Sequence, residues 1–161
     1  MRVTHILTGI SATVLIASAV TAQSGSNSAP EAPASTLVAA RQAGMKMSAA
    51  IVFGQLKPAA AGTGELKPVA NAAQALASWG SAMPGLFAPG SGGAPSHAKP
   101  DLWANKADFD SKAAAFAAAA NAASAAAKAE DHATFAAQVG QLQQSCGGCH
   151  KLYRMEEHPQ P

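Results

Sequence analysis

Cys146-Gly147-Gly148-Cys149-His150 is the stretch around which the rest of the sequence is arranged. It contains both cysteines of the 161-residue chain, and a histidine follows the second cysteine directly. This is the C-x-x-C-H pattern of covalent c-type haem attachment. Each thiol would add across one vinyl group of the haem, and the adjacent imidazole of His150 would bind the iron. We therefore expect one covalently bound haem c per chain.

Three other chemistries use a similar pair of cysteines. A redox dithiol of the thioredoxin kind follows a strand in a βαβ unit, and no strand pattern precedes Cys146. A zinc site needs about four ligands, and the chain has no third cysteine. A disulfide inside the motif leaves His150 unexplained. Haem attachment accounts for all three side chains.

Alanine dominates the composition, whereas aromatic residues make up 5% and charged residues 12% of the chain. Because alanine is the strongest helix former, this composition predicts an all-α fold. An alanine core buries little apolar area per residue, so a large buried prosthetic group would supply the missing hydrophobic volume. The formal net charge of +2 is too small and too dispersed to indicate nucleic-acid binding.

The N-terminal segment 1–22 has the features of a cleaved signal peptide. Arg2 and His5 form a short polar start, and residues 6–20 are apolar but short for a membrane span. The small residues up to Ala22 suit cleavage after that position. An uncleaved membrane anchor is the alternative. Export to the periplasm agrees with the haem motif, because bacterial haem c is attached outside the cytoplasm.

Cleavage would leave three further parts. Residues 23–34 are rich in Ser, Pro and Ala and predict a flexible leader. Residues 35–155 carry the helical pattern and form one domain, and residues 156–161 form a tail. After cleavage, we expect no contact with the membrane.

Four segments of the domain have helical periodicity. We expect helices from Ser35 or Thr36 to Leu56, from Glu65 to Ala82, from Asn105 through Ala127 and from Asp131 through Tyr153. Lys57-Pro58 would end the first of them, because proline disrupts a helix interior. A long Gly/Pro-rich connection, residues 84–104, joins the second helix to the third. This pattern predicts an antiparallel four-helix bundle.

The first helix is expected to place a charged side chain on its inward face. That face comprises Leu37, Arg41, Met45, Ala49, Val52 and Leu56, at spacings of three and four. A buried arginine needs an anion, and haem supplies two carboxylates. A surface salt bridge on a rotated helix is the alternative for Arg41. The last helix has an inward face of Phe135, Val139, Leu142, Cys146, Cys149 and Tyr153, which includes the haem motif.

The chain resembles the cytochrome c-prime family, the class II c-type cytochromes, which are a standard example of four-helix bundles. The matching pieces are Arg41-Gln42-x-x-Met45, Met83-Pro84-Gly85-Leu86-Phe87, Pro100-Asp101-Leu102-Trp103 and Cys146-x-x-Cys149-His150-x-x-Tyr153-Arg154. They occur in the family's order and cover nearly the whole mature chain.

The resemblance implies roles for the matched residues. Thioethers at Cys146 and Cys149 hold the haem, and His150 is the proximal iron ligand. Arg41 and Gln42 then sit against the haem propionates, and Arg154 lies beside the proximal face. The position of an acidic residue that often assists at the haem edge in the family falls near His97 here.

The function depends on Met45, which the resemblance places on the distal side of the iron. If its sulfur binds the iron, the haem is six-coordinate and low-spin, as suits an electron carrier. If Met45 only covers the iron, the haem is five-coordinate and admits small neutral gases such as NO or CO. We expect the five-coordinate state, with Met45 ligation as the alternative. Met47 points about 200° away from Met45 and is a poor competitor.

The resemblance further implies redox partner proteins and a possible homodimer formed through the first two helices. Two other function classes make different predictions. A peroxidase needs a distal acid or base, and Arg41, which is near the distal side, is already assigned to the propionates. A non-haem structural bundle with a disulfide would purify as a colourless protein without covalently bound haem.

Overall fold

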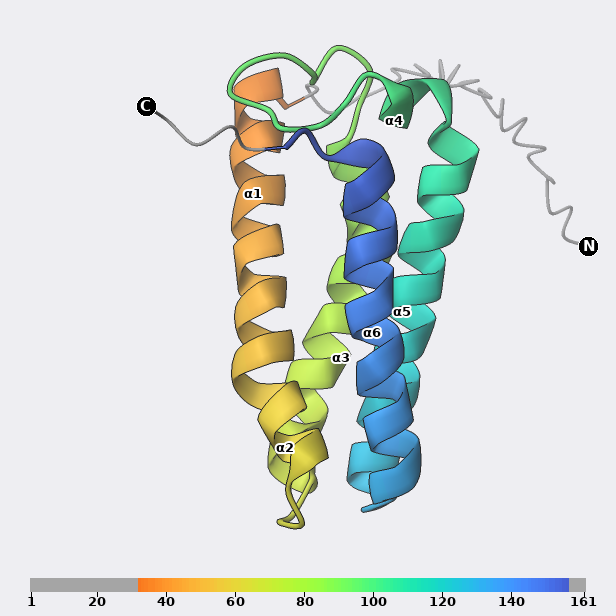
Figure 1. Ribbon diagram of the computed structural model, residues 1–161. Coiled ribbons are helices and arrows are strands. Elements are labelled where there is room, and N and C mark those ends of the chain that lie inside the picture. The colour runs from red at the N-terminus through yellow and green to blue at the C-terminus, as the bar shows by residue number, and fades with distance from the viewer. Residues whose placement is uncertain (1–31, 157–161) are drawn as a thin grey trace, which may run out of the picture. The chain divides into compact units, whose positions relative to one another are not determined.

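The computed structural model describes residues 32–156, so the predicted signal peptide, most of the leader and residues 157–161 lie outside the described part. The elements are α1 (Ala34–Ile51), η1 (Val52–Leu56, a π-helical turn), α2 (Lys57–Ala61), α3 (Lys67–Ala82), η2 (Met83–Leu86, a 3-10 turn), α4 (Asp101–Ala104), α5 (Lys106–Lys128) and α6 (His132–Tyr153). The long helices run antiparallel in a bundle (Figure 1), which confirms the predicted fold class. No helix in the described part combines the length and apolar character that a membrane crossing requires.

The first helical segment does not end at Lys57-Pro58, as the sequence predicted, but continues to Ala61. Proline lacks an N–H, and its ring clashes with the carbonyl four residues earlier in a regular α-helix. Here the backbone widens into the π-helical turn η1, and the Lys57 N–H donates to the carbonyl of Val52, five residues back. The wider turn carries the helix past Pro58.

The buried face of α1 is rotated relative to the prediction. Arg41, Val52 and Leu56 are buried as expected, but Met45 is half-buried and Ala49 is exposed. The deeply buried positions include Gly44, where an added Cβ would lie 2.2–2.5 Å from three ring atoms of Trp79. The missing side chain at Gly44 therefore lets the indole from α3 pack directly on the α1 backbone.

We expect Gly44→Ala to lower the free energy of unfolding. Overpacking costs about 1–3 kcal/mol, which exceeds the gain of about 1 kcal/mol for alanine over glycine in a helix. The matched control is Gly140→Ala in α6, where an added Cβ meets nothing within 4 Å. That variant should unfold at higher urea concentration than the parent. Equal stabilisation by both substitutions would show that Trp79 moves aside without cost.

The face of α5 follows the sequence closely, and the face of α6 does so outside the C-x-x-C-H motif. All six residues predicted for the α5 face are buried: Phe109, Ala113, Phe116, Ala120, Ala123 and Ala127. An added Cβ on Gly80 of α3 would lie 2.8 Å from the Phe116 ring, so small residues allow α3 and α5 to pack closely. The Ser124 hydroxyl donates to the Ala70 carbonyl across this contact, at 2.9 Å.

The buried side chains form two clusters that matter for the site. The lower cluster fills most of the bundle and includes Val52, Leu56 and Leu142, with Cys146 packed against it. The upper cluster lies near the long connection and consists of Met83, Phe87, Leu102, Phe109, Ala113 and Tyr153. Met45 and Trp103 are partly buried against the upper cluster.

Side chains of the α5–α6 turn cap the start of α6 and the start of α3. The Asp131 side chain accepts a hydrogen bond from the Thr134 amide, so α6 begins where the sequence predicted. Glu130, with a φ of 56°, accepts from the amides of Leu66 and Lys67 at 2.8 and 3.1 Å. These backbone hydrogen bonds lower the pKa of Glu130. The turn is thereby tied to the start of α3.

Tyr153 links the end of α6 to α5 at the upper end of the bundle. Its hydroxyl donates to the Asp108 carboxylate of α5, and its ring packs edge-on against Phe109, with ring centroids 5.7 Å apart. The hydrogen bond to Asp108 raises the pKa of Tyr153 to about 12. This arrangement fixes the end of α6 directly beyond the C-x-x-C-H motif.

Candidate functional site

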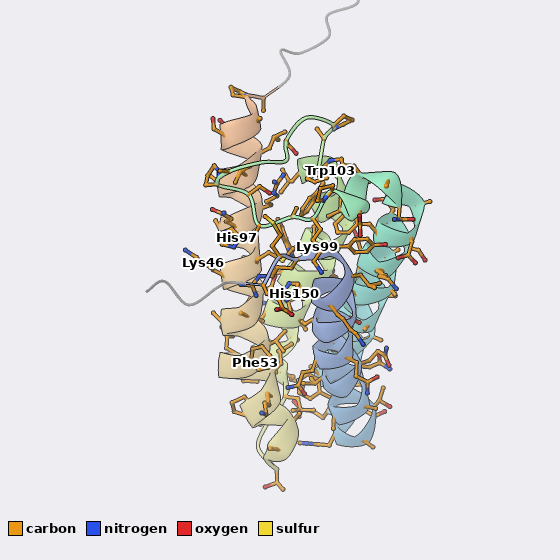
Figure 2. The ribbon with its side chains drawn as sticks, turned by 45° about the horizontal axis from the view of Figure 1, so that its top comes forward. Lys46, Phe53, His97, Lys99, Trp103 and His150 are labelled. Carbon is orange, nitrogen blue, oxygen red and sulfur yellow. The ribbon has the colours of Figure 1, made fainter. Side chains whose placement is uncertain are left out.

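The C-terminal half of α6 presents the three motif side chains together. Cys146 and Cys149 are three positions apart in the helix and therefore lie on one side of it. Both are half-buried free thiols, whereas His150 is exposed. In Figure 2, His150 projects from α6 toward α1. The predicted inward position of the motif is thus only partial, since the flanking Leu142 and Tyr153 are buried but the motif itself is not.

The protonation states of these groups follow from their surroundings. Burial raises the pKa of both the Cys146 and the Cys149 thiol. The imidazole of His150 is accessible but is shielded from water on one side, and this partial desolvation lowers its pKa. The positive charge of Arg154 lowers the pKa further. At neutral pH the cysteines are therefore thiols and the imidazole is neutral. A neutral imidazole has the free lone pair that a metal ligand needs.

The face of α1 opposite this motif is poorly covered. α1 packs against α3 and η2, whereas α6 packs against α5 and meets η1 and α2 at the lower end (Figure 1). Met45 is half-buried, Ala49 is exposed, and Phe53 of η1 is 50% exposed. An apolar, half-covered helix face thus lies opposite two thiols and a neutral imidazole. These residues fit a flat apolar group that is attached to α6 and bound through a metal.

Arg41 lies in a cage formed by the long connection and is only 4% exposed. Its Nη1 donates to the Leu86 carbonyl at 3.1 Å and to the Ser91 hydroxyl at 2.9 Å. Its Nη2 donates to the Ser91 carbonyl at 2.7 Å and to the Ser96 hydroxyl at 2.5 Å. The guanidinium carbon also lies 4.6 Å from the centroid of the Phe87 ring. Hydroxyls, carbonyls and an aromatic face thus solvate this buried cation.

The segment that forms the cage also connects α1 to the end of α6, and we call residues 91–99 the strap. On the α1 side, the Gln42 amide donates to the Pro95 carbonyl at 3.0 Å. On the α6 side, Ala98 and Arg154 form an antiparallel bridge. The Lys99 amide donates to the Tyr153 carbonyl at 2.9 Å. The strap therefore links α1 to the end of α6, the helix that lies opposite the uncovered face of α1.

The remaining predicted residues lie at the upper end of α6. Arg154 is exposed, four residues beyond His150, and its amide donates to the His150 carbonyl at 3.0 Å. Together with Met155 and Glu156, these two residues line an open depression. His97 lies in the strap, where its carbonyl accepts from the Met155 amide at 2.8 Å. The structure thus brings Arg154 and His97 to the His150 end of α6.

Sequence reasoning missed the groups around Arg41 and the position of Phe53. It expected a haem carboxylate for the arginine or else a surface location. The protein groups that the guanidinium contacts are Leu86, Ser91, Ser96 and the aromatic rings of Phe87 and Trp103. The Gly/Pro-rich connection has no periodicity from which this cage could have been predicted. Phe53 adjoins the predicted face, and the π-helical turn that exposes it has no clear sequence signal except the nearby Pro58.

Comparisons with known proteins agree with this geometry. A sequence profile of the family described as Cytochrome C′ matches residues 36–154. Cytochrome c′ from Thermochromatium tepidum is similar, with 29% identity and a TM-score of 0.70 over 78% of this chain and 98% of that one. Ferric cytochrome c prime from Alcaligenes xylosoxidans is similar at 28% identity and a TM-score of 0.70, over 78% of this chain and 98% of that one. No curated protein matches the chain.

Proposed function

Since this chain belongs to the cytochrome c′ family, we propose that it is an exported haem protein with five-coordinate iron that transfers electrons, binds small neutral gases, or both. The family binds haem c covalently, and this chain carries haem c. Variants of the Alcaligenes xylosoxidans protein are described with carbon monoxide and with nitric oxide bound. These relatives support CO and NO as ligands here.

In this proposal, each motif residue has one task. The S–H bonds of Cys146 and Cys149 would add across the two vinyl groups, so that each sulfur would gain a C–S bond and each hydrogen would pass to the neighbouring vinyl carbon. No oxidant is consumed. The neutral imidazole of His150 would bind the iron. Bound haem would supply an iron that takes up and releases one electron and that can bind a small neutral molecule.

The packing of Met45 is the observation that favours five-coordinate iron. Its side chain is half-buried and packs against the upper cluster. In this proposal the sulfur keeps that packing instead of binding the iron. Met45 therefore serves as an apolar cover that restricts the distal side to small neutral molecules. Ligation by Met45 stays the alternative.

We expect the parent protein to show high-spin ferric and ferrous visible spectra, and the ferrous spectrum to shift with CO. Met45→Ala should keep the high-spin spectra and bind CO about tenfold faster, which corresponds to about 1.4 kcal/mol of barrier removed with the apolar cover. Stopped-flow absorbance at the Soret band measures this rate. Met47→Ala is the matched control, because Met47 is 40% exposed and points away from Met45.

Two experimental results would contradict the proposal of covalently bound haem with five-coordinate iron. A low-spin ferrous spectrum that CO leaves unchanged, and that becomes high-spin in Met45→Ala, would establish the six-coordinate electron carrier. A colourless product after acid-acetone extraction and refolding would exclude covalent haem altogether.

Partners and location belong to the same proposal. Small electron-transfer proteins are the expected redox partners, and the expected location is the periplasm, where haem c is attached. The segment that would direct export, residues 1–22, lies outside the described residues. A homodimer formed through the first two helices is also part of the proposal, and one structurally similar cytochrome c′ is described with ligand-controlled dimer dissociation.

A further inference from the structure

Phe53 is an aromatic residue whose exposure the fold alone does not explain. It is 50% exposed, the highest value among the exposed large hydrophobic residues of the described part. Every other phenylalanine in that part is buried: Phe87, Phe109, Phe116 and Phe135. Phe53 belongs to η1, whose neighbouring residues Val52 and Leu56 are fully buried. The turn itself is therefore firmly packed, although one ring is left outside.

The position of Phe53 on the helix follows the uncovered face of α1. Met45, Ala49 and Phe53 are separated by steps of four residues, and each step rotates the side chain by only about 40° around the helix. The side of α1 that contacts Trp79 of α3 carries Gly44 instead. Phe53 thus continues the apolar stripe that begins at Met45, away from the α1–α3 contact.

The level of Phe53 along the bundle corresponds to the start of the haem motif. α6 runs antiparallel to α1 and meets η1 directly. Cys146 packs against the cluster that contains Val52 and Leu56, the residues around Phe53 in η1. In Figure 2, Phe53 lies further along α1 than the level at which His150 projects. Phe53 therefore lies on the Cys146 side of the site, whereas Met45 lies nearer the strap.

We propose that Phe53 is a haem-contact residue whose ring covers the porphyrin edge nearest Cys146 and closes the lower end of the haem site. This inference rests on the proposed attachment of haem at Cys146 and Cys149. An aromatic ring buries a large apolar area and packs favourably against another ring system. The π-helical turn presents this ring, and the covered edge is kept from water. Less water at the haem disfavours the more highly charged ferric state.

The test is NMR of the ferrous CO-bound holoprotein, which is diamagnetic, with selectively labelled phenylalanine. We expect nuclear Overhauser effects between the Phe53 ring protons and haem substituents, and ring-current shifts of those substituents. Phe53→Leu should abolish the ring-current shifts and move the reduction potential to a more negative value. Met47→Leu, another exposed α1 residue on the other side of the helix, should leave both unchanged.

The outcomes separate this proposal from the proposed function. Absence of haem mass on the denatured protein would overturn the attachment itself. Covalent haem without contacts from Phe53 would overturn only the present inference. Contacts between Phe53 and a second copy of the chain, seen in a mixed-label sample, would also overturn it and assign the ring to a dimer interface. If Met45 binds the iron and CO does not, the ferrous protein is low-spin and therefore diamagnetic. The same measurement is then made without CO.

Discussion

Arg41→Met will release the strap and lower the free energy of unfolding by at least about 3 kcal/mol. The substitution removes four hydrogen bonds and leaves acceptors buried without donors, notably the Ser91 carbonyl. Each unsatisfied buried group costs about 1–3 kcal/mol. The effect is measured by urea unfolding and by hydrogen exchange at the amides of Ser91 and Ser96, which donate to Ala88 and Gly93 carbonyls.

Two further variants test the geometry of the cage. Arg41→Lys keeps the charge but has no planar fork, so one ammonium cannot serve Leu86, Ser91 and Ser96 at once, and most of the loss should remain. Gln42→Ala is the neighbouring control. It removes one exposed hydrogen bond to Pro95, and its effect should stay below about 1 kcal/mol. Unchanged strap protection in Arg41→Met would refute the structural role of the cage.

The same variants distinguish the cage from a haem propionate contact. The family resemblance places Arg41 near the propionates, and the Nε–H is the donor that the four cage bonds do not use. If Arg41 acts mainly on the haem, Arg41→Met should destabilise the holoprotein and leave the haem-free chain unaffected. If it acts on the strap, the loss of protection should appear in both.

The case of Arg41 shows what a sequence can reveal about a buried charge. Helical spacing correctly predicted that the side chain is buried, because periodicity depends only on the positions along one helix. The rule that a buried cation needs an anion suggested haem carboxylates. It could not reveal Ser91 and Ser96, because their position depends on the conformation of a connection rich in glycine and proline. Long-range contacts of such a segment leave no periodic signal.

The helices show the same difference between features that periodicity reveals and features that depend on contacts with other elements. The faces of α5 and α6 were predictable, because phenylalanine and leucine at regular spacing identify a core face without knowledge of the partner helix. The face of α1 was predicted with a rotation, since Gly44 carries no apolar side chain and was not recognised as a packing position. Its role comes from Trp79 on another helix. The end at Pro58 was misplaced because a π-helical turn accommodates the proline.

Replacing both Cys146 and Cys149 by alanine will abolish covalent haem, whereas either single variant will retain it through one thioether. Both thiols lie on one side of α6 and both are free, so each can form its bond independently of the other. We expect Cys149→Ala to be the milder change to the fold, since Cys146 packs against the lower cluster. Mass spectrometry of the denatured protein counts the haem, and the pyridine haemochrome spectrum reports how many vinyl groups remain.

His150→Ala separates attachment from ligation. The variant should keep the mass of one haem, because both thiols remain, but lose the spectrum of histidine-bound iron. Added imidazole should restore that spectrum, since the exposed position of His150 leaves room for an external ligand. A zinc site or a redox dithiol makes the opposite prediction, because then no variant would carry haem. Haem mass on the double-alanine variant would show that another residue forms the bond, and the assignment of both cysteines would be wrong.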